Sequence, residues 1–181
     1  KIFFIIPMGY NSKLFRPLDR KRAKEVLCLN IRKKYILFAG NYSQPVKGYS
    51  LAMETMNYLD ASYELIKLDY AKYSDMPKYM NASNVLLMTS YQEGAPVIIK
   101  EALACNLTVV STDVGDVKEI TKDVPGCFIA KSRDPKKIAE LIKKSISIDL
   151  TSVESIKIKK YSANKMNNKL KGLYLEKLGA K

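Results

Sequence analysis

Short aliphatic and β-branched runs alternate along the chain with stretches whose apolar residues recur at helical spacing. The runs predict strands, and a run that is apolar at every position is typical of a strand covered on both faces. The predicted strands are 2–6, 35–39, 63–68, 85–89, 108–112 and 127–130. The predicted helices are 19–29, 48–60, 75–83, 96–105, 116–122 and 135–147. Strand and helix in alternation indicate a doubly wound α/β fold around a parallel sheet.

Local signals at helix ends support these assignments. Asp134 followed by Pro135 predicts a helix start with the carboxylate as N-cap. Asp116 and Glu119 have the spacing of a capping box. The final stretch, 162–178, predicts one more helix with a single apolar stripe. The stripe consists of Met166, Leu170, Leu173, Tyr174 and Leu178.

The composition excludes several classes of chemistry. The 181 residues suit one domain, and 47% hydrophobic with 27% charged residues indicates a globular chain. The chain contains no histidine, which excludes Ser-His-Asp and Cys-His catalysis and Cys₂His₂ zinc sites. Cys28, Cys105 and Cys127 lack CxxC spacing, so we expect buried apolar residues in a reducing compartment rather than disulfides or metal ligands.

The net charge of +13 is concentrated at the two ends of the chain. Residues 1–34 carry a net +8 and residues 154–181 a net +6, whereas 35–153 is nearly neutral. Basic ends of this kind could bind a nucleic acid or an anionic membrane, or they could form a solvated lysine surface that only maintains solubility. The sequence contains no RNA- or DNA-binding signature, and no apolar run approaches the roughly 20 residues of a membrane span. The chain begins without Met and without a full signal-peptide pattern, so we expect it to begin inside a longer protein.

Ligands of open parallel sheets bind beyond the carboxyl ends of the strands. The candidate binding loops are therefore the segments that follow the predicted strands: 40–48, 69–74, 90–96 and 113–116. In the first of these loops, Lys47 lies between Gly40 and Gly48, just before a helix. Such a loop brings a cation and backbone amides to a phosphate. It matches neither dinucleotide nor P-loop patterns, and an ordinary turn with a surface lysine is the alternative.

The loop after the predicted strand 85–89 carries two carboxylates. Glu93 lies just before Gly94 and Pro96, where the first amides of a helix form an anion site. Glu101 lies two turns along the same apolar helix, so it needs a partner, either a ligand hydroxyl or a lysine. Helix-dipole stabilisation of Glu93 and an ion pair of Glu101 are the structural alternatives. Together, the two residues favour a ligand site.

The stretch 90–115, SYQEGAPVIIKEALACNLTVVSTDVG, with E-x7-E spacing from Glu93 to Glu101, resembles the nucleotide-sugar-binding half of the group 1 (family 4) retaining glycosyltransferases of GT-B fold. Ile6–Asn11 resembles the start of that domain, and Gly40 with Lys47-Gly48 resembles its phosphate loop. The resemblance covers roughly 5–147. It implies a Rossmann-like domain at 1–160 and, at 161–181, a C-terminal helix that returns toward an N-terminal acceptor-binding domain missing from this chain.

The resemblance also implies residue roles. Glu93 and Lys47 would act in catalysis, Glu93 on hydroxyls of the transferred sugar and Lys47 on the diphosphate. Glu101 would hold the ribose hydroxyls, and the nucleobase would lie near Tyr70–Tyr73. The remaining donor-binding residues would be Gly94, Ala95, Pro96, Val97, Gly40, Asn41 and Lys72. Asn41 stands where the family usually has an arginine, and Asn106, Thr108 and Asp116 also depart from its pattern.

By resemblance, the whole enzyme would be a hexosyltransferase that moves a sugar from a nucleoside-diphosphate sugar to an acceptor hydroxyl, with retention, in polysaccharide or glycolipid synthesis. No cofactor or metal is expected, and the sequence has no DxD-type cluster. This chain alone would be inactive. We expect a cytoplasmic protein, peripheral at the inner membrane face, whose basic ends lie on one side and meet an anionic membrane or a lipid-linked acceptor.

Two other classes stay open at this point. A nucleotide-sugar epimerase of the same fold would share the donor site. A non-catalytic, flavodoxin-like interaction domain would bind no nucleotide sugar, and an acidic pocket at strand ends, where Asp69 and Asp113 lie, would favour it.

Overall fold

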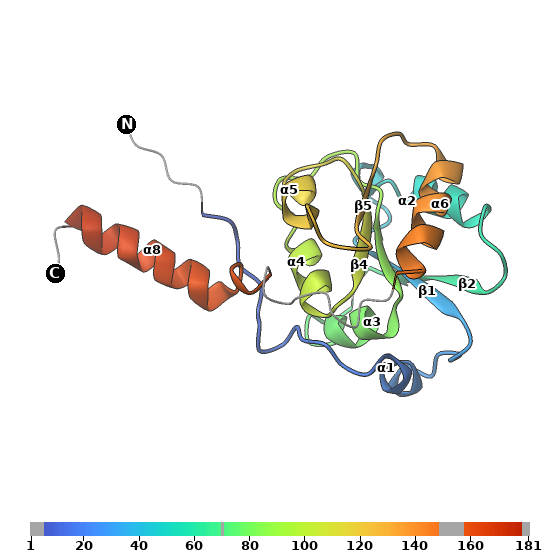
Figure 1. Cartoon of the computed structure of the whole chain (residues 1–181), viewed down its shortest axis with the longest axis horizontal. Coiled ribbons are helices and arrows are strands. Elements are labelled where there is room, and N and C mark those ends of the chain that lie inside the picture. Colours follow the sequence, from blue (N-terminus) through green and yellow to red (C-terminus); the bar gives the residue numbers. More distant parts are fainter. Residues whose placement is uncertain (1–5, 70, 149–157, 179–181) are drawn as a thin grey trace.

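A computed structural model describes residues 6–69, 71–148 and 158–178. Within these residues the chain forms a five-stranded sheet in the order β2-β1-β3-β4-β5, and every pairing is parallel. The strands are β1 Lys34–Ala39, β2 Tyr63–Leu68, β3 Val85–Met88, β4 Thr108–Thr112 and β5 Phe128–Ala130. The predicted doubly wound α/β class is confirmed (Figure 1).

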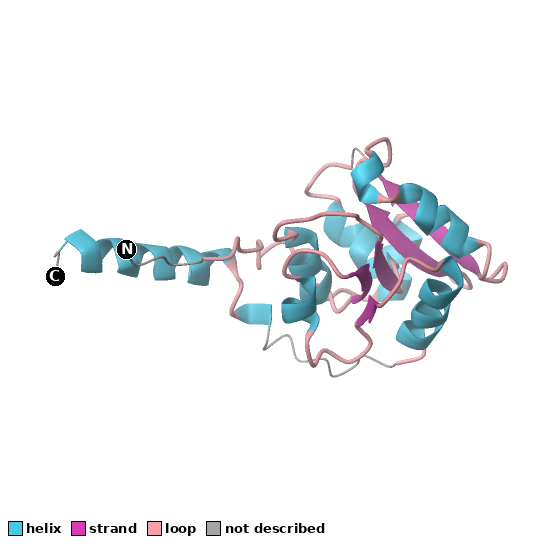
Figure 2. Ribbon diagram, turned by 90° about the horizontal axis from the view of Figure 1, so that it is seen from above, coloured by secondary structure: helices cyan, strands magenta, loops and turns pink. Residues whose placement is uncertain are grey.

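Helices lie on both faces of this sheet, as Figure 2 shows. The helices around the sheet are α1 Arg20–Val26, α2 Tyr49–Met56, α3 Met76–Ala82, α4 Val97–Ala104, α5 Val117–Thr121 and α6 Pro135–Ile146, with a short 3₁₀ turn η1 at Pro45–Lys47. A further helix, α8 Ala163–Leu178, lies away from the sheet (Figure 1). Alternate residues of each strand point to opposite faces. Thus Leu37 belongs to the core cluster that contains residues of α3, α4 and α5, whereas Ile36 belongs to the cluster that contains residues of α2 and α6. Burial on both faces explains the uninterrupted apolar runs of the central strands.

Several element ends differ from prediction. The predicted strand 2–6 falls mostly outside the described residues, and Ile6 is not in a strand. The predicted helix 19–29 stops at Val26, because Cys28 adopts a left-handed φ of 55° and its amide and that of Leu29 bond back to carbonyls of the last turn. Cys28 is also exposed, so its predicted burial is wrong. Burial raises the pKa of the Cys105 and Cys127 thiols to about 12.

The two predicted helix caps have different outcomes. Asp134 caps α6, because its carboxylate accepts the Lys136 amide at 2.9 Å. Asp116 occupies the N-cap position of α5 but its side chain makes no cap bond. Instead it lies 3.6 Å from the ammonium of Lys100, which is fully buried. The predicted capping box is therefore wrong, since the uncompensated charge of a buried lysine outweighs a local cap.

The last helix, α8, extends away from the body of the domain (Figure 1). Its base is fixed to the beginning of the described chain: the Ala163 amide donates to the Tyr10 carbonyl at 2.8 Å, and the Tyr10 amide to the Tyr161 carbonyl at 3.1 Å. A β-carbon on Gly9 would lie only 2.6 Å from the α-carbon of Ala163, so the two segments approach closely there.

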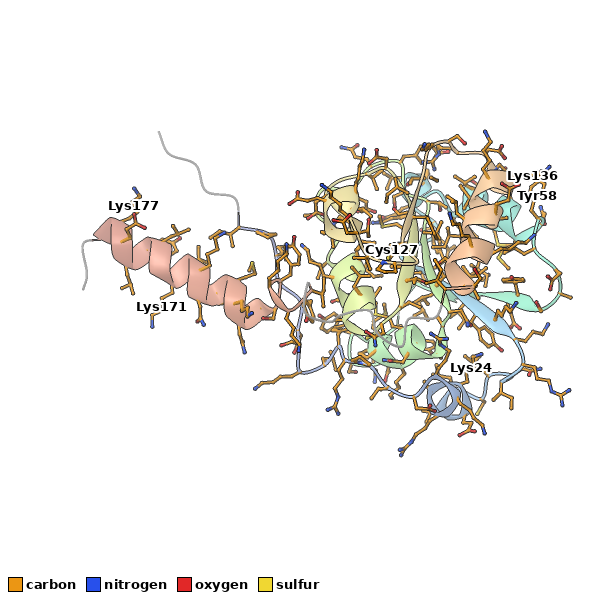
Figure 3. The ribbon with its side chains drawn as sticks, viewed as in Figure 1. Lys24, Tyr58, Cys127, Lys136, Lys171 and Lys177 are labelled. Atoms are coloured by element: carbon orange, nitrogen blue, oxygen red, sulfur yellow. The ribbon has the colours of Figure 1, made fainter. Side chains whose placement is uncertain are left out.

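The expected apolar stripe of α8 is largely exposed. Leu170, Tyr174 and Leu175 are exposed and Met166 and Leu173 half-buried, while the Leu178 side chain lies outside the described part. Figure 3 shows Lys171 and Lys177 projecting from α8, far from Lys24 on α1. Helix α1, which carries part of the basic charge of residues 1–34, packs against α3. The expectation that both basic ends share one side stays a prediction, since residues 1–5 and 179–181 lie outside the described part. No helix in the described ranges is long and apolar enough to cross a membrane.

The Asp134 cap allows a direct test of helix α6. Replacing Asp134 with Ala removes the acceptor for the Lys136 amide. We expect a loss of about 0.5–2 kcal/mol in the free energy of unfolding, measured by urea denaturation. Lys137→Ala, an exposed change on the same helix, is the control and should change the unfolding free energy little. Equal losses in both variants would contradict the cap.

Candidate functional site

A cavity of about 320 Å³ lies at the carboxyl edge of the sheet, between β1, β2, β3 and α4. The ends of the strands form its apolar floor, through Phe38, Leu68, Leu87 and Met88. Polar groups surround this floor: Lys47, Asp69, Ser90 and Glu93. The cavity thus lies at the edge where parallel sheets bind ligands. Of the predicted site residues it brings together Gly40, Lys47, Glu93, Pro96 and Val97.

Lys47 and Glu93 form the centre of the polar rim. The Lys47 ammonium donates to Glu93 Oε1 at 2.9 Å, and the Ser90 hydroxyl donates to the same oxygen at 2.7 Å. The side chains retain 30% and 16% of their exposure, so both remain accessible from the cavity. An ammonium has three protons to donate, so Lys47 can bind a further acceptor without leaving Glu93.

The position of Lys47 depends on the glycine that follows it. Gly48 has a left-handed φ of 65°, and a β-carbon there would lie 2.1 Å from the Thr89 carbonyl oxygen. Only glycine therefore allows the loop before α2 to lie against the end of β3. The Thr89 hydroxyl closes this approach by donating to the Gly48 carbonyl at 2.8 Å. The contact brings Lys47 and Glu93 together from segments 46 residues apart.

The N-terminus of α4 adds backbone amides to the same edge. Pro96 takes the N-cap position and makes no side-chain cap, so the first amides of the helix, from Val97, are not capped by that residue. These amides and the helix dipole favour an anion. Gly94 and Ala95 precede the helix in an exposed loop and do not line the cavity. Gly115, with φ of 54°, lies against the Gly94 carbonyl, where a β-carbon would come within 2.2 Å.

Glu101 has a partner that the sequence did not indicate. Its side chain is buried, and Oε1 accepts a hydrogen bond from the Tyr73 hydroxyl at 2.7 Å. Within the described residues a tyrosine, and not the lysine of the structural alternative, is therefore the partner of Glu101. Burial raises the pKa of Glu101, and the Tyr73 hydrogen bond partly offsets this rise. Burial and the neighbouring carboxylate raise the pKa of Tyr73. Glu101 does not itself line the cavity.

The buried lysine of α4 is Lys100, next to Glu101 in the chain. Its ammonium donates to the Met8 carbonyl at 3.1 Å, pairs with Asp116, and lies 5.3 Å from the centre of the Tyr161 ring. Sequence reasoning missed this role. The signal was available, because a lysine within an apolar helix needs a partner as much as a glutamate does.

The remaining predicted donor residues lie outside the cavity lining. The Asn41 side chain accepts bonds from the amide and hydroxyl of Ser43, at 2.9 and 2.5 Å, and so holds its own turn. Lys72 is exposed in the loop between β2 and α3. Tyr70, the first residue of the expected base-binding stretch, lies outside the described residues. The donor-binding roles of these residues stay predictions.

Three residues of the site were missed or given another role. Ser90 binds Glu93, and Arg133 donates to the carbonyls of Thr89 and Ser90. Asp69 lines the cavity, and its Oδ1 is buried without a hydrogen-bond partner in the described part. Asp69 follows β2 directly and Arg133 lies in the loop after β5, and these positions beyond strand ends are the signal for both. Within the described ranges, no three Cys, Asp or Glu side chains gather as metal ligands.

The fold and the edge cavity define a Rossmann-like α/β domain. Residues 61–147 match the family model described as "Glycosyl transferases group 1". This segment runs from just before β2 to the end of α6 and includes Glu93, Glu101 and the N-terminus of α4. The resemblance to the group 1 glycosyltransferases of GT-B fold noted in the sequence is confirmed over this segment, which makes up just under half of the chain. No curated protein matches the chain in sequence.

Solved structures share the fold at low sequence identity. Sucrose-phosphate synthase from Thermosynechococcus elongatus is 18% identical with a TM-score of 0.83, over 97% of this chain and 53% of that one. HepE from Anabaena, in complex with UDP and glucose, is 15% identical with a TM-score of 0.74, over 92% and 55%. The C-terminal domain of a glycosyl transferase group 1 family protein (LpcC) from Francisella tularensis is 15% identical with a TM-score of 0.66, over 92% and 98%. The chain thus spans about half the length of the first two proteins.

The Tyr73–Glu101 hydrogen bond predicts a pH-dependent stability. Burial raises the pKa of Glu101 above its usual 4.5, so its ionisation costs stability as the pH rises from 4.5 through the raised value. The Tyr73 hydroxyl offsets part of this cost. Tyr73→Phe should therefore lose about 1–3 kcal/mol relative to the unchanged chain at pH 8, and less at pH 4 where the carboxyl is protonated.

Thermal melts between pH 4 and pH 8 measure this difference. Tyr58→Phe is the control, because the structure gives that exposed ring no hydroxyl partner among the described residues. Its melting temperature should follow the unchanged chain at every pH. A deficit of Tyr73→Phe that is constant with pH, or larger at pH 4, would show that the hydroxyl does not stabilise the carboxylate.

Proposed function

We propose that this chain is the donor-binding half of a retaining glycosyltransferase of hexosyltransferase type, which moves a sugar from a nucleoside-diphosphate sugar to an acceptor hydroxyl. One observation carries the proposal: Lys47 and Glu93, 2.9 Å apart, share one cavity with the start of helix α4. A cation, a carboxylate and helix-terminal amides at one point suit a ligand with both a diphosphate and sugar hydroxyls.

The diphosphate would bind to Lys47 and to the amides that begin at Val97. Negative charge grows on the departing diphosphate as the bond to the anomeric carbon breaks, and fixed donors stabilise that charge without rearranging. Helix dipole and ammonium would supply this stabilisation without a metal ion. Glu93, held by Lys47 and Ser90, would accept hydrogen bonds from hydroxyls of the transferred sugar.

The nucleoside would bind on the Glu101 side of the site. Glu101 uses Oε1 for the Tyr73 hydroxyl, so ribose hydroxyls would bind at Oε2 or displace Tyr73. HepE, which shares this fold, binds UDP and glucose, and that complex supports a nucleoside-diphosphate sugar as the donor here. A leaving-group oxygen would take the acceptor proton, a route that needs no histidine.

The acceptor site would lie on a second, N-terminal domain, so this chain alone would transfer no sugar. The match to the group 1 glycosyltransferases favours sugar transfer over an epimerase and over a flavodoxin-like interaction domain. The whole enzyme would serve polysaccharide or glycolipid synthesis in the cytoplasm, peripheral to the inner membrane face. The exposed lysines of α8 support that location: Lys165, Lys169, Lys171 and Lys177.

Nucleotide binding tests the donor site directly. We expect the 181-residue chain to bind UDP or GDP in calorimetry, equally with and without EDTA. Glu101→Ala should lose affinity for the nucleotide itself, by about 1.5–3 kcal/mol, whereas Glu93→Ala should weaken mainly the corresponding nucleotide sugar.

Thermal melts of both variants are the control, because loss of the buried Glu101 could unfold the domain. Binding that requires Mg²⁺ would refute the metal-free site, and equal losses of UDP or GDP affinity in both variants would refute the division of roles. Sugar transfer to an acceptor by this chain alone would contradict the proposed need for a second domain.

Membrane association is tested with vesicles. We expect the chain to cosediment with anionic but not with neutral phospholipid vesicles, and to dissociate as salt rises, because each lysine near such a surface contributes about 1 kcal/mol that salt screens. The triple change Lys165→Glu, Lys169→Glu and Lys171→Glu should abolish cosedimentation. Lys131→Glu, Lys136→Glu and Lys137→Glu together alter the net charge equally and should retain more of it. Equal losses would indicate a diffuse effect of net charge, and no binding at low salt would leave α8 as a solvated surface.

A further inference from the structure

Arg133 lies in the loop after β5 and reaches the end of β3. One guanidinium nitrogen donates to the Ser90 carbonyl at 3.0 Å and the other to the Thr89 carbonyl at 2.6 Å. The same group stacks on the Tyr91 ring, with its central carbon 3.6 Å from the ring centre. Three consecutive residues are therefore held by one side chain. Arginine suits this role because its donors form a rigid planar fork.

The two carbonyls that Arg133 binds have no strand partner. β3 ends at Met88, so Thr89 and Ser90 lie beyond the sheet ladder although both are buried. A buried carbonyl needs a donor. The Thr112 hydroxyl, at 2.7 Å, and Arg133 supply donors to Ser90. The backbone that leads to Glu93 is thus fixed from β4 and from the loop after β5.

Arg133 also lies against the loop that carries Lys47. A β-carbon on Gly48 would come 2.9 Å from the guanidinium nitrogen that binds Thr89. The Tyr91 amide donates to the Val46 carbonyl at 2.8 Å, so the residue stacked on Arg133 is itself bonded to that loop. Arg133 therefore lies where the Lys47 loop and the Glu93 loop meet. It does not line the cavity.

We propose that Arg133 is a positioning residue that holds Lys47 and Glu93 in their paired geometry for the diphosphate and sugar of the donor, without touching the donor. This inference rests on the proposed function. A misplacement of about 1 Å at such groups can cost on the order of 100-fold in function. Lysine at this position would keep the charge but could not form the fork across two carbonyls.

The first experiment needs no ligand. Amide resonances of the isotopically labelled chain are compared for Arg133→Gln, Arg133→Lys and the control Lys131→Gln, which removes the same charge from an exposed residue of the same loop. Both Arg133 variants should shift the amides of Lys47, Gly48, Ser90 and Glu93. Lys131→Gln should not. Shifts confined to residues 131–135 would overturn the proposal.

The second experiment measures affinity for UDP and GDP by calorimetry. Arg133→Gln should weaken whichever nucleotide the unchanged chain binds by roughly 10- to 100-fold. Arg133→Lys should recover only part of that loss, and Lys131→Gln should behave as the unchanged chain. Arg133→Gln is then repeated in a Lys47→Ala background. Because the ammonium that Arg133 positions is absent there, the further loss of nucleotide affinity should fall below about twofold.

The outcomes separate the two proposals. Equal fold-losses for Arg133→Gln in both backgrounds would show that Arg133 supports only the fold, and full recovery by Arg133→Lys would show that charge alone matters. Either result overturns the positioning role while the unchanged chain still binds its nucleotide. An unchanged chain that binds neither UDP nor GDP would instead refute the donor site, and the positioning role with it.

Discussion

Burial of the sheet on both faces is the constraint on which the rest of this structure depends. Helices α3, α4 and α5 cover one face, and α2 and α6 cover the other, so polar chemistry is confined to the ends of the strands. Buried backbone just beyond a strand end loses its ladder partners and requires donors from elsewhere. Thr112 and Arg133 supply them at Ser90. The requirement that buried backbone groups find hydrogen-bond partners therefore determines which side chains lie at this edge of the sheet.

The features that could be predicted from the sequence are those set by local pattern. The strands at 35–39 and 108–112 are apolar runs that only double burial explains, and Asp134 with Pro135 is a cap with a local mechanism. The loops of the site were located for the same reason, since they follow strands. Local pattern failed at Asp116, where capping-box spacing was present but the ammonium of Lys100 attracts the carboxylate.

The side-chain pairings within the site could not be predicted, because they depend on how distant loops converge. Tyr73 and Glu101 are 28 residues apart, and Arg133 reaches carbonyls 43 and 44 residues away. Glu93 and Glu101 each accept their hydrogen bonds at Oε1. Each carboxylate is therefore oriented before a ligand binds. Orienting dipoles in advance avoids the cost of rearranging them when charge develops on a bound molecule.

Lys100 connects helix α4 to the base of α8. At one end, α4 offers its first amides to the cavity; one turn further, Lys100 holds the Met8 carbonyl and lies under the Tyr161 ring. Met8 and Tyr161 belong to the two segments that are hydrogen-bonded to each other at the base of α8. The base of α8 is therefore held by α4, the same helix whose N-terminus lies at the cavity. A substitution at Lys100 would therefore disturb two distant places at once, the base of α8 and the helix that begins at the cavity.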